Sequence, residues 1–333
     1  MPWHVQQNIV NKANHETKLT LRQCSKNLNA FVKKSTMSYD GLNLRWENDK
    51  QCIRVCLIFS GEVLTVEFQS QNDGFLKKTK SDSRGNYDTE KFVENQNYMD
   101  GAVEQFVKVL KEYPRVHLGR LFVSFDSYTE EERYNDRKEE LMEKLVTALQ
   151  NLKKKLVVRE FDMYNDRNGT DILRILTFLT PGVLKTIAFF PSVAASAWNR
   201  YHDIDLSEIA ETEQWRQAKV LYLARYHLTV PREKTAHFSK ISYSTPNFYL
   251  EDAIYFLENI FNKHWHTRVL HCVTMDYIGI LQHLKPFKFK RHNRSKEFKI
   301  RKGDDVCYVF VCSNRKQISF SKNSHRVHYA GAL

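Results

Sequence analysis

The chain has 333 residues, of which 42% are hydrophobic, a content that is ordinary for a globular protein with a sizeable core. No apolar run approaches the roughly 20 residues that a membrane-spanning helix needs, and the N-terminus lacks the regions of a secretory signal peptide. We therefore expect a soluble protein of the cytoplasm, with the nucleus as a second location, and no membrane partner.

Six cysteines are spread along the chain. They are too sparse for the disulfide framework of a secreted protein, and most lie within apolar runs such as residues 307–312. We expect them to be small buried hydrophobic residues.

The net charge is +12, and the basic residues are concentrated between Lys285 and Lys302, where the single acid is Glu297. Phenylalanines are interleaved with them. A basic loop with aromatics is more often a solvated face or a protein-docking surface than a reader of nucleic acid, so a nucleic-acid role is the less favoured interpretation. The candidate residues of this basic surface are Lys288, Lys290, Arg291 and Arg294.

Three segments organise the first third of the chain. Residues 1–31 have apolar positions at helical spacing and predict two or three short helices. Residues 53–68 are β-branched and aromatic, with a Ser-Gly turn signal at residues 60–61, and predict a β hairpin. The polar stretch at residues 69–86 predicts a loop or linker.

The rest of the chain alternates between short apolar strands and amphipathic helices. We expect strands at about residues 121–125, 156–161, 183–190, 218–223 and 268–273, and helices at about 98–113, 130–153, 171–179, 206–212 and 250–262. A recurrence of about 30 residues predicts parallel βαβ units in an open, leucine-rich-repeat-like stack. Residues 297–301, 306–312 and 317–320 predict a C-terminal antiparallel β meander.

The predicted fold class is therefore α/β, with a small N-terminal helical domain, leucine-rich-repeat-like βα repeats and the C-terminal meander. The expected divisions are residues 1–35 for the helical domain, 36–95 for the hairpin and linker, 96–285 for the α/β repeats, and 286–333 for the basic loop and meander.

The sequence contains no recognisable set of catalytic residues at the spacing that a known catalytic motif requires. The sequence has no Gly-rich phosphate loop, no Gly-x-Ser-x-Gly, no His-Glu-x-x-His and no Cys-x-x-Cys. The nearest metal candidates are His264, His266, His271 and Cys272, but neighbouring residues of a strand point to opposite faces and would not converge on one ion. We expect a protein that is not an enzyme and that has no cofactor and no metal.

Two N-terminal stretches carry a family resemblance. Residues 1–10 (Met-Pro-Trp-His-Val-Gln-Gln-Asn-Ile-Val) and 19–28 (Leu-Thr-Leu-Arg-Gln-Cys-Ser-Lys-Asn-Leu) resemble the F-box pattern. The pattern is degenerate, because Ala13 and Asn14 stand where a larger apolar residue is common and Cys24 replaces the usual Val. The resemblance implies an F-box at residues 1–35. The positions that would pack on a Skp-type adaptor, or shape that surface, are Pro2, Val5, Ile9, Leu21, Ser25 and Leu28.

A second resemblance lies in the α/β region. Residues 209–219 (Ile-Ala-Glu-Thr-Glu-Gln-Trp-Arg-Gln-Ala-Lys), in their setting between residues 178–184 and 237–252, resemble the FTH domain of nematode F-box proteins. We expect Trp215 to be a buried anchor of the fold, in preference to a direct substrate contact. The motif residues, expected to mark the fold, are Glu213, Gln214, Trp215, Ala218 and Lys219.

Together the resemblances imply a substrate-recognition adaptor of a Skp-cullin-F-box-type ubiquitin ligase. Its partners would be a Skp-type adaptor, the cullin-based ligase and a protein substrate. Two alternatives stay open: a protein-interaction module that has lost ligase docking, and a basic nucleic-acid-binding protein.

Overall fold

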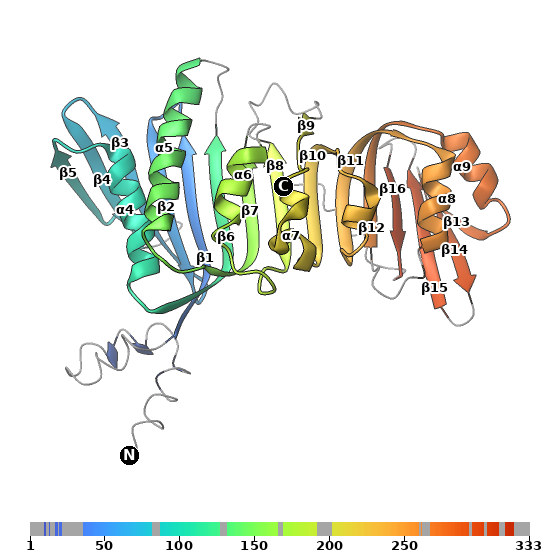
Figure 1. Cartoon of the computed structure of the whole chain (residues 1–333), viewed down its shortest axis with the longest axis horizontal. Helices are drawn as coiled ribbons and strands as arrows, with labels where there is room; N and C mark the ends of the chain where they lie inside the picture. The colour runs from blue at the N-terminus through green and yellow to red at the C-terminus, as the bar shows by residue number, and fades with distance from the viewer. Residues whose placement is uncertain are drawn as a thin grey trace. The chain divides into compact units, whose positions relative to one another are not determined.

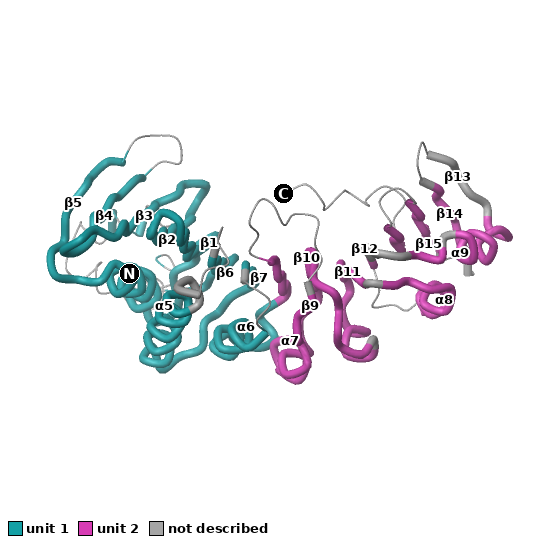
Figure 2. Tube along the Cα trace, turned by 90° about the horizontal axis from the view of Figure 1, so that it is seen from above, with its two compact units in different colours: residues 1–184, 192–199 teal, residues 185–191, 200–333 magenta. Residues whose placement is uncertain are grey.

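A computed structural model describes most of the chain in two compact units (Figure 2). Unit 1 comprises residues 1–184 with 192–199, and unit 2 comprises residues 185–191 with 200–333. The described residues are 36–81, 87–126, 132–165, 169–191, 202–259, 261, 267–292, 295–302, 305–312 and 317–322, with Val10, Ala13, Thr17, Lys18, Thr20 and Leu21.

Unit 1 is built on a mixed β-sheet. Its strand order is β7-β6-β1-β2-β3-β4-β5. Strands β1 to β5 pair antiparallel, whereas β1, β6 and β7 run parallel to one another. The strands are β1 (Thr36–Glu47), β2 (Cys52–Phe59), β3 (Glu62–Gln71), β4 (Gly74–Lys80), β5 (Thr89–Glu94), β6 (Arg115–Asp126) and β7 (Val157–Asn165).

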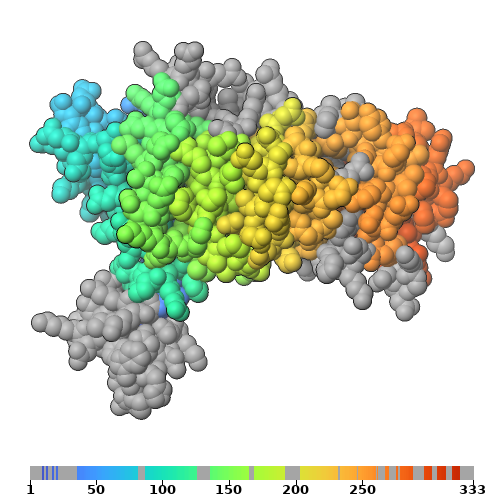
Figure 3. All heavy atoms as spheres, viewed as in Figure 1, coloured from blue at the N-terminus to red at the C-terminus, as the bar shows by residue number. Residues whose placement is uncertain are grey.

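Helices cover one face of this sheet. They are α4 (Tyr98–Lys111), α5 (Glu132–Gln150) and α6 (Gly169–Leu176), all on the same side of the strands (Figures 1 and 2). In the space-filling view the side chains of α5 and α6 hide most of the strands behind them (Figure 3). The core beneath is aromatic and aliphatic, and its fully buried large side chains include Trp46, Phe68, Phe106, Phe125 and Phe161.

The hairpin predicted at residues 53–68 is confirmed as β2 and β3. Its turn residues, Ser60 and Gly61, both have positive φ, of 51° and 82°, which suits the twist of a two-residue hairpin. The following loop prediction was wrong over residues 74–80, which form β4. Phe75 is buried under α4, while the other β4 side chains are half-buried, so β4 has no apolar run that would reveal a strand.

Unit 2 also contains a mixed sheet. Its strand order is β13-β14-β15-β16-β12-β11-β10-β8, with β9 beside β10. Strands β8 to β12 run parallel, and β12 to β16 are joined by antiparallel pairs. The strands are β8 (Thr186–Pro191), β9 (His202–Ile204), β10 (Val220–Leu228), β11 (Lys240–Phe248), β12 (Thr267–Met275), β13 (Lys288–His292), β14 (Ser295–Lys302), β15 (Asp305–Cys312) and β16 (Gln317–Ser321).

The helices of unit 2 are short. Helices α7 (Glu213–Gln217) and α8 (Leu250–Asn259) lie over one face of its parallel strands (Figure 2), and α9 (Tyr277–Leu284) follows β12. Two 3-10 turns span Ile209–Glu211 and Arg232–Thr235. The expected C-terminal antiparallel strands are present as β14, β15 and β16.

The predicted fold class was wrong. Each unit has a mixed sheet, and β1 to β5 add an antiparallel half to unit 1 where a hairpin and linker were expected. The physical reason is that antiparallel strands with one polar face lack the continuous apolar run of strands buried on both faces. The leucine-rich-repeat-like stack was therefore the wrong architecture.

The small N-terminal helical domain is also corrected. Within residues 1–35, those that the structure describes form no helical F-box. Leu21 is half-buried, and Lys18 donates a hydrogen bond to the Thr36 carbonyl at 2.7 Å. The predicted adaptor positions Pro2, Val5, Ile9, Ser25 and Leu28 lie outside the described residues.

A buried ion pair joins α5 to α6. Lys138 Nζ lies 2.8 Å from Asp171 Oδ2, and the two side chains are only 9% and 2% exposed. Arg174 adds more exposed bonds from α6 to Glu139 and Glu143 of α5, at 2.7 and 2.6 Å. Removing one partner of a buried pair is costly, because the other charge stays desolvated.

We expect Lys138→Met to lower the free energy of unfolding by about 3 kcal/mol, because the Asp171 carboxylate loses its nearest cation. The double variant Lys138→Met/Asp171→Leu should recover most of that loss. Lys144→Met removes the exposed pair with Asp100 and should cost less than about 1 kcal/mol. Urea unfolding measures all three, and a double variant as unstable as Lys138→Met alone would contradict the explanation.

Candidate functional site

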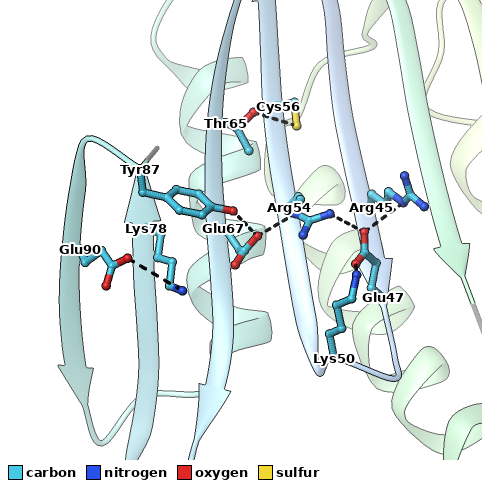
Figure 4. Close-up of polar contacts among 10 residues, drawn as sticks. All are labelled: Arg45, Glu47, Lys50, Arg54, Cys56, Thr65, Glu67, Lys78, Tyr87 and Glu90. Atoms are coloured by element: carbon cyan, nitrogen blue, oxygen red, sulfur yellow. Dashed lines mark hydrogen bonds and ion pairs between the residues drawn. The ribbon is translucent and has the colours of Figure 1, made fainter. Parts of the chain in front are cut away.

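The helix-free face of the unit 1 sheet is polar (Figure 4). The strand registers pair Arg45 with Arg54, Arg54 with Glu67, and Glu67 with Lys78, so these side chains share one face. The alternate residues of β2 and β3, such as Val55 and Phe68, lie on the face that packs under α4. The alternation thus separates an apolar core from a row of charges.

Two almost fully buried carboxylates organise this row. Glu47 is 4% exposed and Glu67 is 6% exposed. Arg54 lies between them and donates from Nη1 to Glu47 Oε1 at 2.5 Å and from Nε to Glu67 Oε2 at 2.7 Å. Tyr87 donates to Glu67 Oε2 at 2.5 Å, and Lys50 donates to Glu47 Oε2 at 2.9 Å. Such charge-assisted bonds are among the stronger hydrogen bonds of proteins.

The network shifts the acidities of its members. Burial acts to raise the pKa of Glu67, but the bonds from Tyr87 and Arg54 outweigh it and hold that pKa below its usual range. Burial and then the bond to Glu67 raise the pKa of Tyr87 to about 12. Burial acts to lower the pKa of Arg54, yet its two carboxylate partners raise it overall.

This arrangement stabilises charges and offers no reactive group. The Glu67 carboxylate accepts bonds from two donors, so it is poorly suited to act as a base. Burial raises the pKa of the Cys52 thiol to about 12 and also raises that of Cys56, so neither is a ready thiolate. We therefore interpret the polar face of unit 1 as a stabilising network of the sheet.

The motif around Trp215 lies in α7 of unit 2. Thr212 caps the helix by accepting from the Trp215 backbone nitrogen at 3.2 Å. The Trp215 side chain is fully buried, and its Nε1 donates to the Lys234 carbonyl at 2.8 Å. Its ring meets Phe238 edge-on with centroids 5.0 Å apart, and His237 Nε2 lies 2.8 Å from its carbonyl oxygen. Trp215 thus joins α7 to residues 234–238.

The other motif residues divide between core and surface. Gln214 and Ala218 are buried, and Ala218 ends the helix. Glu213 is exposed, and its carboxylate accepts a hydrogen bond from Gln217 Nε2 at 2.8 Å. Lys219 is exposed, and its carbonyl accepts from Ser239 Oγ at 2.9 Å.

Unit 2 also has two exposed large apolar side chains, called here the Tyr249–Ile278 pair. Tyr249 is 56% exposed and Ile278 is 69% exposed. Tyr249 follows the end of β11, and Ile278 lies in the first turn of α9 just after β12. These two parallel strands pair directly. The backbone nitrogen of Asp276 donates to the Phe248 carbonyl at 3.0 Å, which ties the two strand ends together. The sequence analysis missed this pair, since exposure depends on packing.

The predicted basic residues lie mostly in a strand. Lys288, Lys290 and Arg291 belong to β13, where a loop was expected, and Arg294 lies outside the described residues. His264 and His266 also lie outside them. In the part of the chain that the structure describes, no group of three or more His, Cys, Asp or Glu could hold a metal. None of the helices described has both the length and the apolar run required to span a membrane.

A cavity of about 10 Å³ lies beneath α8. It is lined by Tyr243, Tyr255 and the buried Arg268, whose Nη2 donates to the Phe238 carbonyl at 2.5 Å. Burial lowers the pKa of Arg268 to about 10. A space of this size holds at most one water molecule, so it cannot take a substrate.

The comparison with protein families matches residues 139–287 to the FTH domain. This stretch is somewhat less than half of the chain. The matched stretch begins within α5, includes the Trp215 motif and the Tyr249–Ile278 pair, and ends just after α9. FTH is a family linked to F-box proteins, which indicates a role in protein interaction. Comparisons with curated proteins and with solved structures gave no match.

The lowered pKa of Glu67 predicts an acid-sensitive contribution to stability. A carboxylate whose pKa is lower when folded contributes fully above its unfolded value, near 4.3, and that contribution is lost as pH falls through the folded value. Glu67→Gln should lower the free energy of unfolding at pH 7 by about 2 kcal/mol, and its stability should fall less between about pH 5 and pH 3 than that of the wild type.

Urea unfolding across this pH range measures the effect. Glu90→Gln is the matched control, because the Glu90 carboxylate is exposed and its Oε1 makes only a long ion pair, 4.0 Å, with Lys78 Nζ. It should change neither the stability nor the pH profile measurably. Parallel pH profiles for Glu67→Gln and the wild type would contradict the role given to Glu67.

Proposed function

We propose that this protein recruits a target protein through its FTH domain and serves as the substrate-recognition adaptor of a Skp-cullin-F-box-type ubiquitin ligase. The observation that carries the proposal is the FTH match at residues 139–287, because that family is linked to F-box proteins. In this role the chain binds and positions other proteins and performs no chemistry itself.

The Tyr249–Ile278 pair is the proposed contact for the target. Single exposed apolar residues are common, but here two large ones follow adjacent, hydrogen-bonded strand ends within the matched domain. Tyrosine is enriched among the residues that dominate protein interfaces. Ligand contacts also concentrate on the loops beyond the carboxyl ends of parallel strands. These points favour a protein partner at this position.

The proposed contact with the Skp-type adaptor lies in residues 1–35. The support is the resemblance of residues 1–10 and 19–28 to the F-box pattern. Short apolar segments of this kind gain stability by burying their apolar side chains in a partner. A chain that keeps target binding but lacks this contact would be an interaction module outside the ligase.

We expect the full chain to capture a purified Skp-type adaptor at physiological salt and Val5→Asp/Ile9→Asp to lose that capture, because two charges would enter the apolar contact. Gln6→Asp/Gln7→Asp is the control, because it adds the same two negative charges at neighbouring positions, and it should still bind. A pull-down against a panel of Skp-type adaptors measures this. No capture by the wild type would exclude the ligase role and leave the interaction module.

Trp215→Phe and Ile278→Asp should act in opposite ways. Trp215→Phe leaves the Lys234 carbonyl without its donor and should lower the free energy of unfolding by about 2 kcal/mol, while target capture by the folded protein persists. Ile278→Asp should leave stability within about 0.5 kcal/mol and abolish capture of proteins that the wild type enriches.

Urea unfolding and quantitative proximity labelling measure the two effects. Glu251→Gln, an exposed change near Tyr249, is the control for labelling. If Ile278→Asp and Glu251→Gln enrich the same proteins as the wild type, the apolar pair is not the target contact.

A further inference from the structure

We propose that the outer edge of β13 binds an extended acidic segment of a target protein as an added β-strand. The inference rests on the target binding proposed above and names the chemistry of the bound segment. It assigns a role to the basic residues that the stabilising network and the Trp215 motif leave unexplained.

Strand β13 is the last in the strand order of unit 2. Along one edge it pairs antiparallel with β14, from Lys288 opposite Lys299 to His292 opposite Ser295. No other strand among the described residues pairs with it. A terminal strand presents backbone N–H and C=O groups that can pair with a further strand, and this is how several peptide-binding domains capture extended ligands.

The charge of the β13–β14 hairpin determines which charge a bound segment should carry. Residues 285–302 carry a single acid, Glu297, which the register places opposite Lys290. The basic residues of this stretch are Lys285, Lys288, Lys290, Arg291, Arg294, Lys296, Lys299, Arg301 and Lys302. An acidic segment is therefore attracted to this edge, whereas a basic segment is repelled.

The register of the β13–β14 hairpin also favours an acidic ligand. Lys288 stands directly opposite Lys299, and Arg291 opposite Lys296. Like charges in directly opposed positions of an antiparallel pair are unfavourable. Because the register places like charges opposite each other at the end of the sheet, an acidic strand lying alongside is favoured.

The buried aromatic of this hairpin favours a peptide over nucleic acid. Single-stranded nucleic acids bind basic surfaces on which exposed aromatic rings stack with the bases. Phe298, one of the interleaved phenylalanines, is only 2% exposed and belongs to the core. Nucleic acid also cannot extend a β-sheet through backbone pairing, whereas an extended peptide can.

The test uses the full chain and a short fluorescent peptide that alternates glutamate with valine, followed by fluorescence anisotropy. We expect binding that weakens as salt is raised. Lys288→Glu/Arg291→Glu should weaken it by at least about tenfold, because the edge loses its charge complementarity. Lys108→Glu/Lys153→Glu is the matched control, since these exposed lysines of unit 1 give the same change in net charge, and it should bind as the wild type does.

Backbone pairing is tested separately from charge. Two further peptides have the same sequence but carry N-methyl groups on alternate amides, on either the odd or the even positions. A strand pairs along one edge, so one of the two should bind at least about tenfold more weakly than the unmethylated peptide. Circular dichroism and urea unfolding confirm that the variants remain folded.

Several results would overturn the inference. These are no binding of the glutamate peptide, an equal loss in the Lys108→Glu/Lys153→Glu control, or unchanged binding of both methylated peptides. Tighter binding of a single-stranded oligonucleotide, lost in Lys288→Glu/Arg291→Glu, would assign the surface to nucleic acid. The Skp-type pull-down and the Ile278→Asp comparison change no β13 residue, so failure of the edge and failure of the proposed function are distinguishable.

Discussion

The one-sided cover of helices over the unit 1 sheet is the constraint on which the rest of that unit depends. Because α4, α5 and α6 lie over a single face, each strand must present apolar residues to that face and can place polar residues on the other. In β3 the side chain of Phe68 therefore lies on the covered face, and that of its neighbour Glu67 lies on the helix-free face. The charges on the helix-free face must then balance one another, and Arg54 does so by joining two buried carboxylates.

In unit 2 the same alternation positions residues of the stretch that matches the FTH domain. Ile241 and Tyr243 lie with Phe256 of α8 around the small cavity, on the covered side of β11. Trp215 extends this packing through the residues that precede β11, where it fixes α7 against residues 234–238. With these anchors buried, Tyr249 and Ile278 remain exposed beyond the ends of β11 and β12.

The sequence predicted elements with a strong apolar period and missed those with a polar face. Helix α4 was placed to within two residues of its observed end, because one whole side of it is apolar and Asn97 caps its start. Strands β4 and β11 were not found: β4 is rich in lysine, and the apolar residues of β11 are separated by serine, threonine and proline. Such strands become recognisable only when the neighbouring strand and the covering helix are known.

The candidate sites likewise include features that the sequence could predict and features that it could not. The family resemblance pointed to the FTH motif, although periodicity alone could not have singled out Trp215 from other aromatic residues. The exposure of Tyr249 and Ile278 could not be predicted, because it follows from how the ends of β11 and β12 are joined. The basic stretch was visible as charge and β14 within it was predicted, but the strand conformation of β13 was hidden by the lysines that interrupt its apolar residues.

The two terminal strands show why the charge of an edge matters. Strand β5 ends the order in unit 1 and carries both signs, with Glu90, Lys91 and Glu94. Mixed charges discourage edge-to-edge pairing without favouring either sign of partner. Strand β13 carries only basic charge, so two copies of it repel each other and self-association through this edge is disfavoured. The same charge that protects the edge from a second copy of the chain leaves it open to an acidic strand, so protection and selection follow from one feature of the sequence.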